Sequence, residues 1–321
     1  MNSGKGAIGK AARALAVLCL LFIGARETIM PARAQGATPA TDATQTIEER
    51  VRQPGAIPAL DVAQEEAILT GRDDILLLKP RKLFELYAEP GYRFTTNAFL
   101  SDQLKHADHY VLGTVGGRVA TRVDQKVDVF ADAKLFGARY ANNPVLDYDA
   151  GQGSLGAETP VADGWRAGFS LVGTWVYDRG FDRRLVRLGD FNIPVRKTFQ
   201  IGDDVLIVPF GAFTRTWSSP RDFMNVQLRG GSTFIHALSA KFYLSVTPSL
   251  YWRHYDSFFE PVFNKTREDV NLDGQFGFIW APAEFVSLST QIVLTRNWST
   301  LAPNDYRALT AAPTVRLSIK F

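Results

Sequence analysis

Apolar and polar residues alternate in short runs over residues 82–321, and this period of two constrains the fold more than any single motif does. The final residues, PTVRLSIKF, show it clearly, with Val315, Leu317, Ile319 and Phe321 in the apolar set. Successive side chains of a β-strand point to opposite faces, so each run predicts a strand with one apolar and one polar face. Residues 82–321 therefore predict an all-β structure.

Two kinds of connection separate these runs. Short turns at 122–126, 201–204, 238–241 and 281–284 alternate with longer polar segments at 101–108, 257–269 and 299–305. This alternation is typical of a transmembrane antiparallel up-and-down barrel, with short turns on the periplasmic side and longer loops outside. The predicted strands are 82–96, 107–121, 126–141, 145–158, 165–178, 183–200, 204–218, 223–238, 241–256, 268–281, 285–299 and 306–321. The fourth is rich in glycine, and a turn at 160–165 connects it to the fifth. They predict a barrel of twelve strands.

The two faces of these strands suit different surroundings. In 241–256 one face carries Leu244, Val246 and Trp252, and the other carries Tyr251 and Arg253. The core of a soluble sandwich would not tolerate such charges without partners. Tryptophans gather near strand ends, as in the interfacial girdles of membrane barrels. The pattern therefore predicts an apolar outer face and a polar inner face.

Residues 1–34 have the layout of a cleaved signal peptide. Basic residues precede an apolar stretch at 14–25, and ARA at 32–34 offers the small residues of a cleavage site. Residues 1–34 hold five basic residues and one acidic residue, so their removal changes the net charge from +3 to −1. Such a mature chain gives no indication of nucleic-acid binding. It also loses Cys19, its one cysteine, and with it any disulfide.

Residues 35–81 differ in composition from the rest. Residues 35–59 are rich in Ala, Thr, Pro and Gln and indicate a flexible lead, whereas DVAQEEAILTG at 61–71 indicates a short helix that Gly71 ends. We therefore divide the chain into a signal peptide at 1–34, a periplasmic lead with a short helix at 35–81, and a barrel at 82–321.

The export signal, the alternating strands and the terminal VRLSIKF together resemble the bacterial (Gram-negative) outer-membrane β-barrel proteins. The resemblance implies a place in the cell outer membrane, surrounded by lipid and lipopolysaccharide, after transit with periplasmic chaperones. It also implies that the last strand, with Val315, Leu317, Ile319 and Phe321, is the signal read by the barrel-assembly machinery. The phrase VYDRGFDRRL at 176–185 resembles segments of a poorly characterised proteobacterial subgroup, and no activity attaches to it.

Two motifs suggest other chemistry and fit it poorly. GQGSLG at 151–156 lacks the helix that would hold a pyrophosphate, so its glycines indicate bending or packing in the barrel wall. DVNLDG at 269–274 begins like a calcium loop, but Trp280 stands where the bidentate glutamate belongs. A weak surface calcium site at Glu260, Glu268 and Asp269 is an alternative. We favour no cofactor-binding site and no metal site.

The histidines do not indicate an active site. His106, His109, His236 and His254 lie near loops or strand ends, and none has a serine and a third polar group in the arrangement that a hydrolase needs. We expect no enzyme activity and no catalytic residue.

Charged and tyrosine side chains on the predicted inner face are the candidate functional residues. We expect Asp128 and Asp132 to form a salt-bridge network with Lys134 and Arg118. Charges segregated to opposite walls would create a transverse field that selects solutes. Interdigitated charges would instead form a closed ion-pair network, and the barrel would be a plug rather than a pore. The candidate lumen-lining residues are Arg93, Arg118, Asp128, Asp132, Lys134, Arg196, Tyr251, Arg253, Asp273 and Arg316.

The sequence thus predicts a monomeric, porin-like barrel that acts as a narrow passive channel for an unidentified small polar solute. Two alternatives stay open. In one, the barrel conducts nothing and is a structural or surface-binding protein whose outer loops, especially 257–268, contact a partner. In the other, it is an outer-membrane component of an export system, and 35–81 recruits periplasmic machinery or lies inside the barrel.

Overall fold

The computed structural model describes residues 83–321, except 103, 124, 125, 203, 240, 261–264 and 284. The predicted signal peptide, the lead and its helix lie outside the described residues, so these predictions stay predictions. Among the residues that are described, no helix has the length and apolar character needed to cross a membrane.

The described chain is a succession of antiparallel strands joined by turns and by three short 3-10 helices. The strands are β1 (Phe84–Thr95), β2 (Asp108–Val123), β3 (Val127–Tyr140), β4 (Tyr148–Ala162), β5 (Trp165–Tyr177), β6 (Arg184–Lys197), β7 (Phe199–Ile201), β8 (Val205–Ser219), β9 (Asn225–Ser239), β10 (Phe242–Glu260), β11 (Lys265–Ala283), β12 (Val286–Ser299) and β13 (Tyr306–Lys320). The 3-10 helices are η2 (Pro144–Leu146), η3 (Arg221–Phe223) and η4 (Ala302–Asn304).

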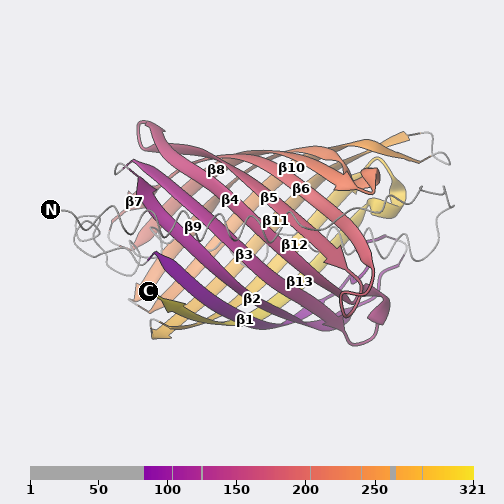
Figure 1. Ribbon diagram of the computed structural model, residues 1–321, viewed down its shortest axis with the longest axis horizontal. Coiled ribbons are helices and arrows are strands. Elements are labelled where there is room, and N and C mark those ends of the chain that lie inside the picture. The colour runs from indigo at the N-terminus through magenta and orange to yellow at the C-terminus, as the bar shows by residue number, and fades with distance from the viewer. Residues whose placement is uncertain are drawn as a thin grey trace. The chain divides into compact units, whose positions relative to one another are not determined.

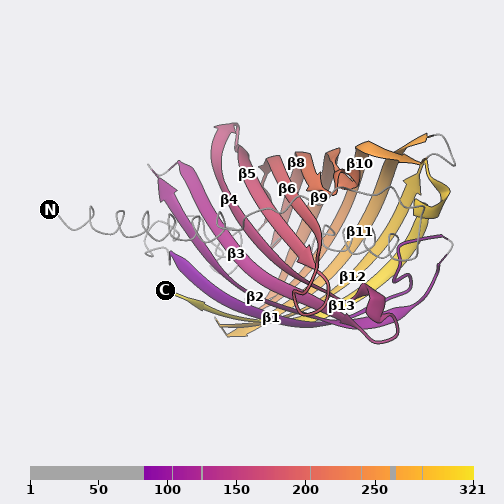
Figure 2. The same cartoon turned by 45° about the vertical axis from the view of Figure 1, so that its right-hand side comes forward.

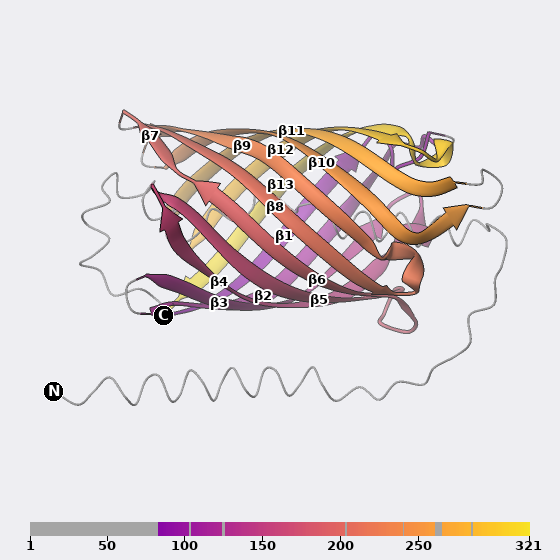
Figure 3. The same cartoon turned by 90° about the horizontal axis from the view of Figure 1, so that it is seen from above.

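These strands close into one barrel. Apart from the short β7, which pairs only with β8, each strand pairs with its neighbours in sequence; β6 pairs with β8, and β1 pairs with β13. The short β7 continues β6 along the same edge of β8, so the ring has twelve strands. The strands tilt across the barrel (Figures 1 and 2), and Figure 3 shows the side that carries β6, β8 and β9. The predicted twelve-stranded up-and-down barrel is confirmed.

The last strand closes the ring on the first. Backbone N–H groups of Phe84 and Phe321 each donate to the carbonyl oxygen of the other at 3.0 Å. Their rings stack with centroids 5.9 Å apart. Phe321 is 61% exposed, on the same face as Leu317 and Ile319, so the terminal aromatic is presented to the surroundings of the barrel. Recognition of this strand by an assembly machinery stays a prediction.

The two faces of the sheet differ as the alternation predicts. Large apolar side chains are exposed on one face, for example Leu244 and Leu250 on β10, while Ser245, Ser249 and Arg253 of the same strand are buried on the other. Several polar side chains of the second face reach a strand two places away, such as Tyr87 of β1 to Asp132 of β3. The concave side of a barrel brings such strands closer together. The polar face is therefore the inner one.

Aromatic residues mark both ends of the apolar band. Trp217, Trp252 and Trp298 are exposed on the outer face near the ends of strands at the long-loop end, and Trp280 is exposed near the other end. Tryptophan favours the interface between lipid tails and headgroups. The band between them is the part of the barrel suited to lipid.

Several predicted boundaries are wrong. The segment 257–269 is not a long loop, because β10 runs to Glu260 and β11 starts at Lys265, with Glu260 paired to Lys265. Beyond the lipid both faces of a hairpin meet water, so a strand can continue there without alternation. The fourth strand starts at Tyr148 rather than 145 because η2 occupies the residues before it. Its turn is also tighter than predicted, since β4 runs to Ala162 and Asp163 and Gly164 adopt positive φ.

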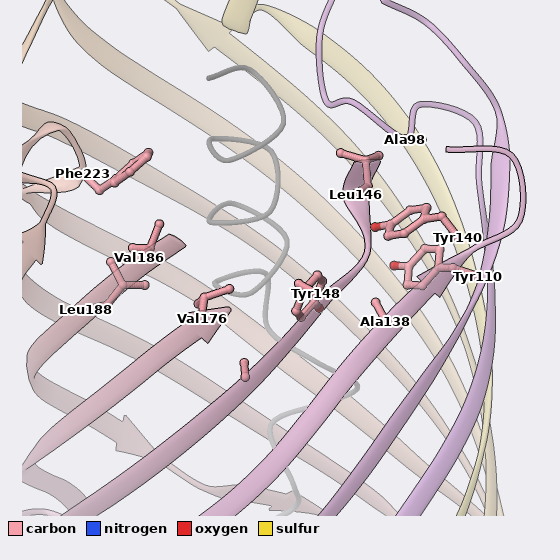
Figure 4. Packing of buried hydrophobic residues seen from close by; sticks show 11 residues of the cluster. Ala98, Tyr110, Ala138, Tyr140, Leu146, Tyr148, Val176, Val186, Leu188 and Phe223 are labelled. Atoms are coloured by element: carbon pink, nitrogen blue, oxygen red, sulfur yellow. The ribbon is translucent and has the colours of Figure 1, made fainter. Parts of the chain in front are cut away.

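The inner face is apolar at the long-loop end on one side. Tyr110, Tyr140, Tyr148, Val176 and Val186 come together there from the ends of β2 to β6. Ala98, Leu146 and Phe223 join them from the connections between strands (Figure 4). These connections therefore turn toward the barrel interior and narrow its outer mouth.

Candidate functional site: the inner wall of the barrel

The strand register decides which side chains share the inner face. Glu85 pairs with Arg118, Arg118 with Asp132, and Arg253 with Asp269, so these residues point to one side of the sheet. The same parity around the ring puts the predicted candidates on that side, namely Arg93, Arg118, Asp128, Asp132, Lys134, Arg196, Tyr251, Arg253, Asp273 and Arg316. Whether they select solutes stays a prediction.

A ladder of ion pairs crosses five adjacent strands near the short-turn end. The guanidinium of Arg122 on β2 donates to Asp128 on β3 at 2.7 Å from Nε. Asp128 also binds Arg166 on β5, which reaches Glu158 on β4 at 3.3 Å. Glu158 in turn accepts from Arg196 on β6 at 2.6 Å and 2.7 Å. Three guanidiniums thus share two carboxylates, which leaves the ladder with a surplus of positive charge.

Glycine explains how one of these contacts forms. Glu158 pairs with Gly168 on β5, and a Cβ atom added at Gly168 would lie 2.3 Å from the backbone oxygen of Ala157. The absent side chain leaves the inner face of β5 open at this point. The Glu158 carboxylate can therefore extend over β5 to Arg196.

A second glycine serves the same purpose on β2. Tyr87 pairs with Gly116, and a Cβ atom there would lie 2.6 Å from the tyrosine ring. The ring lies over Gly116, and its hydroxyl donates to Asp132 on β3 at 3.1 Å. Asp132 is thus held by a phenol two strands away.

The predicted network of Asp128 and Asp132 with Lys134 and Arg118 is therefore wrong in its partners. Among the described residues Asp128 pairs with Arg122 and Arg166. The guanidinium of Arg118 lies over the ring of Phe130 at 5.7 Å, and the ammonium of Lys134 lies over Phe136 at 5.5 Å. The two cations rest on aromatic faces and do not bridge to the aspartates.

Arg316 organises the seam between β13 and β1. Its Nη1 and Nη2 atoms donate to Glu89 and Glu85, each at 2.7 Å, and its guanidinium lies 4.7 Å from the ring centroid of Tyr87. Two carboxylates and one tyrosine of the first strand thus converge on one arginine of the last strand.

The opposite wall carries an arginine–tyrosine cluster. Arg253 donates to the hydroxyl of Tyr255 at 2.8 Å and to Gln227 at 3.1 Å and 3.2 Å. Arg267 lies 4.4 Å from the ring centroid of Tyr255 and pairs with Asp269 at 2.6 Å. Cations and an aromatic face alternate here across β10 and β11, and Gln227 of β9 supports Arg253.

Charges of opposite sign therefore interdigitate on the inner wall. The ion pairs described above join residues of the same, neighbouring or next-neighbouring strands, as in Arg316 with Glu85 and Arg196 with Glu158. Such pairs run along the wall. Of the two predicted arrangements, these pairs match the interdigitated one.

Within the part of the chain that the structure describes, several buried polar atoms of the inner wall have no hydrogen-bond partner. Both amide atoms of Asn271 are among them, although its neighbours Asp269 and Asp273 accept hydrogen bonds from Arg267 and Thr295. Further inward atoms of this kind are Arg93 Nε, Arg118 Nε, Asn225 Oδ1, Arg229 Nε, Gln291 Nε2 and Thr314 Oγ1. Leaving such groups unsatisfied is unfavourable.

Arg122, Glu158 and Arg166, members of the ladder, were not among the sequence candidates. Arg122 falls in a segment predicted as a turn, yet it follows Arg118 by four residues and so continues the inward set of β2. Glu158 and Arg166 flank a predicted turn in the same way. Continuing the alternation of inward and outward residues to the last residue of each strand would have predicted that all three point inward.

The motifs with competing explanations lie in the barrel wall. GQGSLG is the middle of β4, and DVNLDG is part of β11, where Asp269, Asn271 and Asp273 alternate inward. Nowhere in the described chain do three His, Cys, Asp or Glu side chains gather in a way that could hold a metal ion.

The comparisons with known proteins concern the fold. No protein-family model and no curated protein matches the chain. Among solved structures, an outer membrane channel from Pseudomonas putida F1 is similar with a TM-score of 0.50 and 10% identity, over 76% of this chain and 97% of that one. The KdgM porin in complex with disordered oligogalacturonate has a TM-score of 0.43 and 6% identity, over 73% of this chain and 99% of the porin. The beta domain of the Bordetella autotransporter BrkA has a TM-score of 0.43 and 11% identity, over 74% of this chain and 100% of that domain.

The Pseudomonas putida channel, with a TM-score of 0.50, is similar to this chain in fold. A closed barrel satisfies the hydrogen bonds of all its strands, and an apolar outer band suits lipid. The chain has both, together with exposed tryptophans at each end of the band. Its fold is that of a Gram-negative outer-membrane β-barrel protein, and the outer membrane is where such a barrel resides.

Proposed function

We propose that the barrel is a narrow passive channel for small polar solutes. The inward ion pairs carry this proposal, because each pair described above joins the same, a neighbouring or a next-neighbouring strand, as in Arg196 with Glu158. Such pairs lie along the wall and line the lumen with polar groups. A lumen lined in this way suits water and small polar solutes.

The mixed charges of the wall suit polar solutes of either sign. Ion pairs that lie along the wall leave it hydrophilic without bridging the lumen. The surplus positive charge of the ladder formed by Arg122, Asp128, Arg166, Glu158 and Arg196 gives a modest preference for anions. The ten candidate lumen residues are proposed to set this preference together with the ladder.

The apolar cluster at the outer mouth supports a second candidate, a barrel that conducts nothing and acts through its outer surface. Leu146 and Phe223 turn inward there and are buried. Hydrophobic constrictions can exclude water and so close a pore. The long loop that this alternative relied on, 257–268, is largely replaced by the extended hairpin of β10 and β11.

A liposome-swelling assay with neutral sugars of increasing size distinguishes the two. A channel lets small sugars enter faster than protein-free liposomes do, and its rate falls as the sugar grows. Phe223→Ala should raise the size limit, because Phe223 lies inside the barrel at its outer mouth, whereas Phe278→Ala on the outer face should leave it unchanged. Equal rates with and without protein would reject the channel.

The role of residues 35–81 in an export system stays a prediction, since these residues lie outside the described part of the chain. Protease treatment of the folded protein tests it. Protection of 61–71 would place that segment within the barrel, and prompt cleavage would leave it available to periplasmic partners.

A further inference from the structure

The connection between β5 and β6 is a small ordered structure in its own right. It spans 178–183 within the segment VYDRGFDRRL, to which the proposed channel assigns no role. The Asp178 N–H donates to the Arg183 carbonyl at 2.9 Å, and the Phe181 N–H donates to the Asp178 carbonyl at 3.2 Å. The Asp178 carboxylate accepts from the Arg183 N–H at 2.7 Å. Three hydrogen bonds thus fix the shape of a six-residue connection.

Neighbouring strands anchor this connection. Asp149 on β4 accepts from the Gly180 N–H at 2.7 Å and from Nη2 of Arg139 on β3 at 2.7 Å and 2.8 Å. Phe181 has a φ of 60°, which a phenylalanine rarely adopts, and its ring lies 5.4 Å from that of Tyr177. Backbone strain of this kind persists where the surroundings hold it and often marks functional segments. The connection is therefore preorganised.

The surface that the connection presents is basic. The side chains of Arg179 and Arg183 are 73% and 76% exposed, and Arg184 and Arg187 are exposed as well. The nearby carboxylates of Asp147 and Asp149 are buried and already hydrogen-bonded.

Two more carboxylates belong to the connection itself. Asp178 accepts a hydrogen bond from the Arg183 N–H and also lies 3.5 Å from Arg183 Nε, and Asp182 is exposed. Arg179 lies 3.9 Å from Asp147, so the surface carries four guanidiniums against three carboxylates and keeps a net positive charge.

An apolar surface for acyl chains lies directly beneath these guanidiniums. Arg187 pairs in register with Trp175 on β5 and with Ser219 on β8, and it shares the outward face of β6. Further along the same face Phe169, Leu171 and Trp217 are exposed. The connection lies at the long-loop end of the barrel, which faces outward in barrels of this kind. A basic rim above an apolar wall at that height matches a phosphorylated lipid of the outer leaflet.

We propose that Arg179, Arg183, Arg184 and Arg187 form a binding site for the phosphorylated headgroup of an outer-leaflet lipid. The acyl chains of that lipid lie along the outer faces of β5, β6 and β8. Guanidinium binds phosphate with two parallel hydrogen bonds, so arginine suits this task better than lysine does. The fixed shape of the connection lowers the cost of ordering the site when the lipid binds. The site is independent of conduction through the lumen.

Binding of lipid A to the detergent-solubilised protein, produced by export of the full chain, tests the proposal. The probes are lipid A with two phosphates, the same lipid with none, and inorganic phosphate. The triple variant Arg183→Ser, Arg184→Ser, Arg187→Ser should bind the diphosphorylated lipid about tenfold more weakly. The matched variant Lys126→Ser, Lys241→Ser, at the short-turn end, should bind it as the unaltered protein does.

Each other outcome rejects the proposal. Equal affinity for phosphorylated and unphosphorylated lipid would mean that the apolar face alone binds. Inorganic phosphate that binds as tightly as the lipid would identify free phosphate as the ligand. Unchanged affinity in the triple variant would remove the arginines from the site.

A second variant covers a failure of the triple variant to fold. Asp182→Asn removes the exposed carboxylate of the connection and leaves its hydrogen bonds intact. It should tighten binding of the diphosphorylated lipid about twofold to threefold. No change, or weaker binding, contradicts the proposal.

Discussion

Arg316 on β13 and Glu85 on β1 form an ion pair across the seam of the barrel, with Nη2 and Oε1 2.7 Å apart. The two residues are separated by 231 positions in the sequence, and the same guanidinium also binds Glu89. The pair joins the first and last strands through side chains in addition to their backbone ladder.

Arg316→Ala should destabilise the folded barrel by roughly 3 kcal/mol, because it leaves Glu85, only 8% exposed, without its cation. Urea unfolding followed by the loss of heat-modifiable migration measures this. Arg307→Ala, on the exposed outer face of the same strand, is the control and should change stability by less than about 0.5 kcal/mol. The double variant Arg316→Met, Glu85→Gln should recover much of the loss; a further fall in stability would mean that the pair is not what the seam depends on.

Gly116→Val should destabilise the barrel by about 1–3 kcal/mol, because its side chain would overlap the ring of Tyr87. The displaced ring would also lose its hydrogen bond to Asp132. Gly113→Val on the same strand, where an added Cβ atom meets nothing within 4 Å, is the matched control. Equal unfolding midpoints for the two variants would show that Tyr87 does not lie over Gly116.

Asp132→Lys should shift the ion selectivity of the channel toward anions. A unit charge about 4 Å away contributes about 1 kcal/mol in water, and the substitution changes the charge by two units, so the chloride-to-potassium permeability ratio should rise by more than about fivefold. Reversal potentials in a potassium chloride gradient measure it. Asp182→Lys, in the exposed connection between β5 and β6, is the control and should leave the ratio unchanged. The same ratio in both variants would place Asp132 outside the conduction path.

Phe321→Ser should slow assembly more than it lowers stability. Its ring stacks on Phe84 and is otherwise exposed, so stability should fall by about 1 kcal/mol. If the last strand is the assembly signal, the yield of folded barrel in outer membranes should fall sharply. Phe285→Ser, also exposed near the short-turn end, serves as the control. Matching yields for the two variants would speak against a role of Phe321 in recognition.

The barrel itself could be predicted because its signal is repeated. A period of two in strand after strand reports which face meets lipid, and turn length reports the order of the strands. The pattern fails where the lipid ends: 257–260 read as a loop, yet the backbone there continues β10 to Glu260. Alternation between apolar and polar residues marks where a strand has lipid on one face, and it does not mark where the strand ends.

The partners of the inward charges could not be predicted in the same way. Parity gives the face of Asp132 but not its height relative to residues two strands away. Its partner is Tyr87, because Gly116 on the strand between them leaves room for the ring. Pairing of this kind depends on the stagger of three strands and on one absent side chain.

The central claim is that the lumen conducts. Single-channel recording of refolded residues 35–321 in a planar bilayer at high salt tests it most directly. The account predicts steady ohmic current steps, with the permeability ratio altered by Asp132→Lys. Silence from protein that is demonstrably folded and heat-modifiable would contradict it.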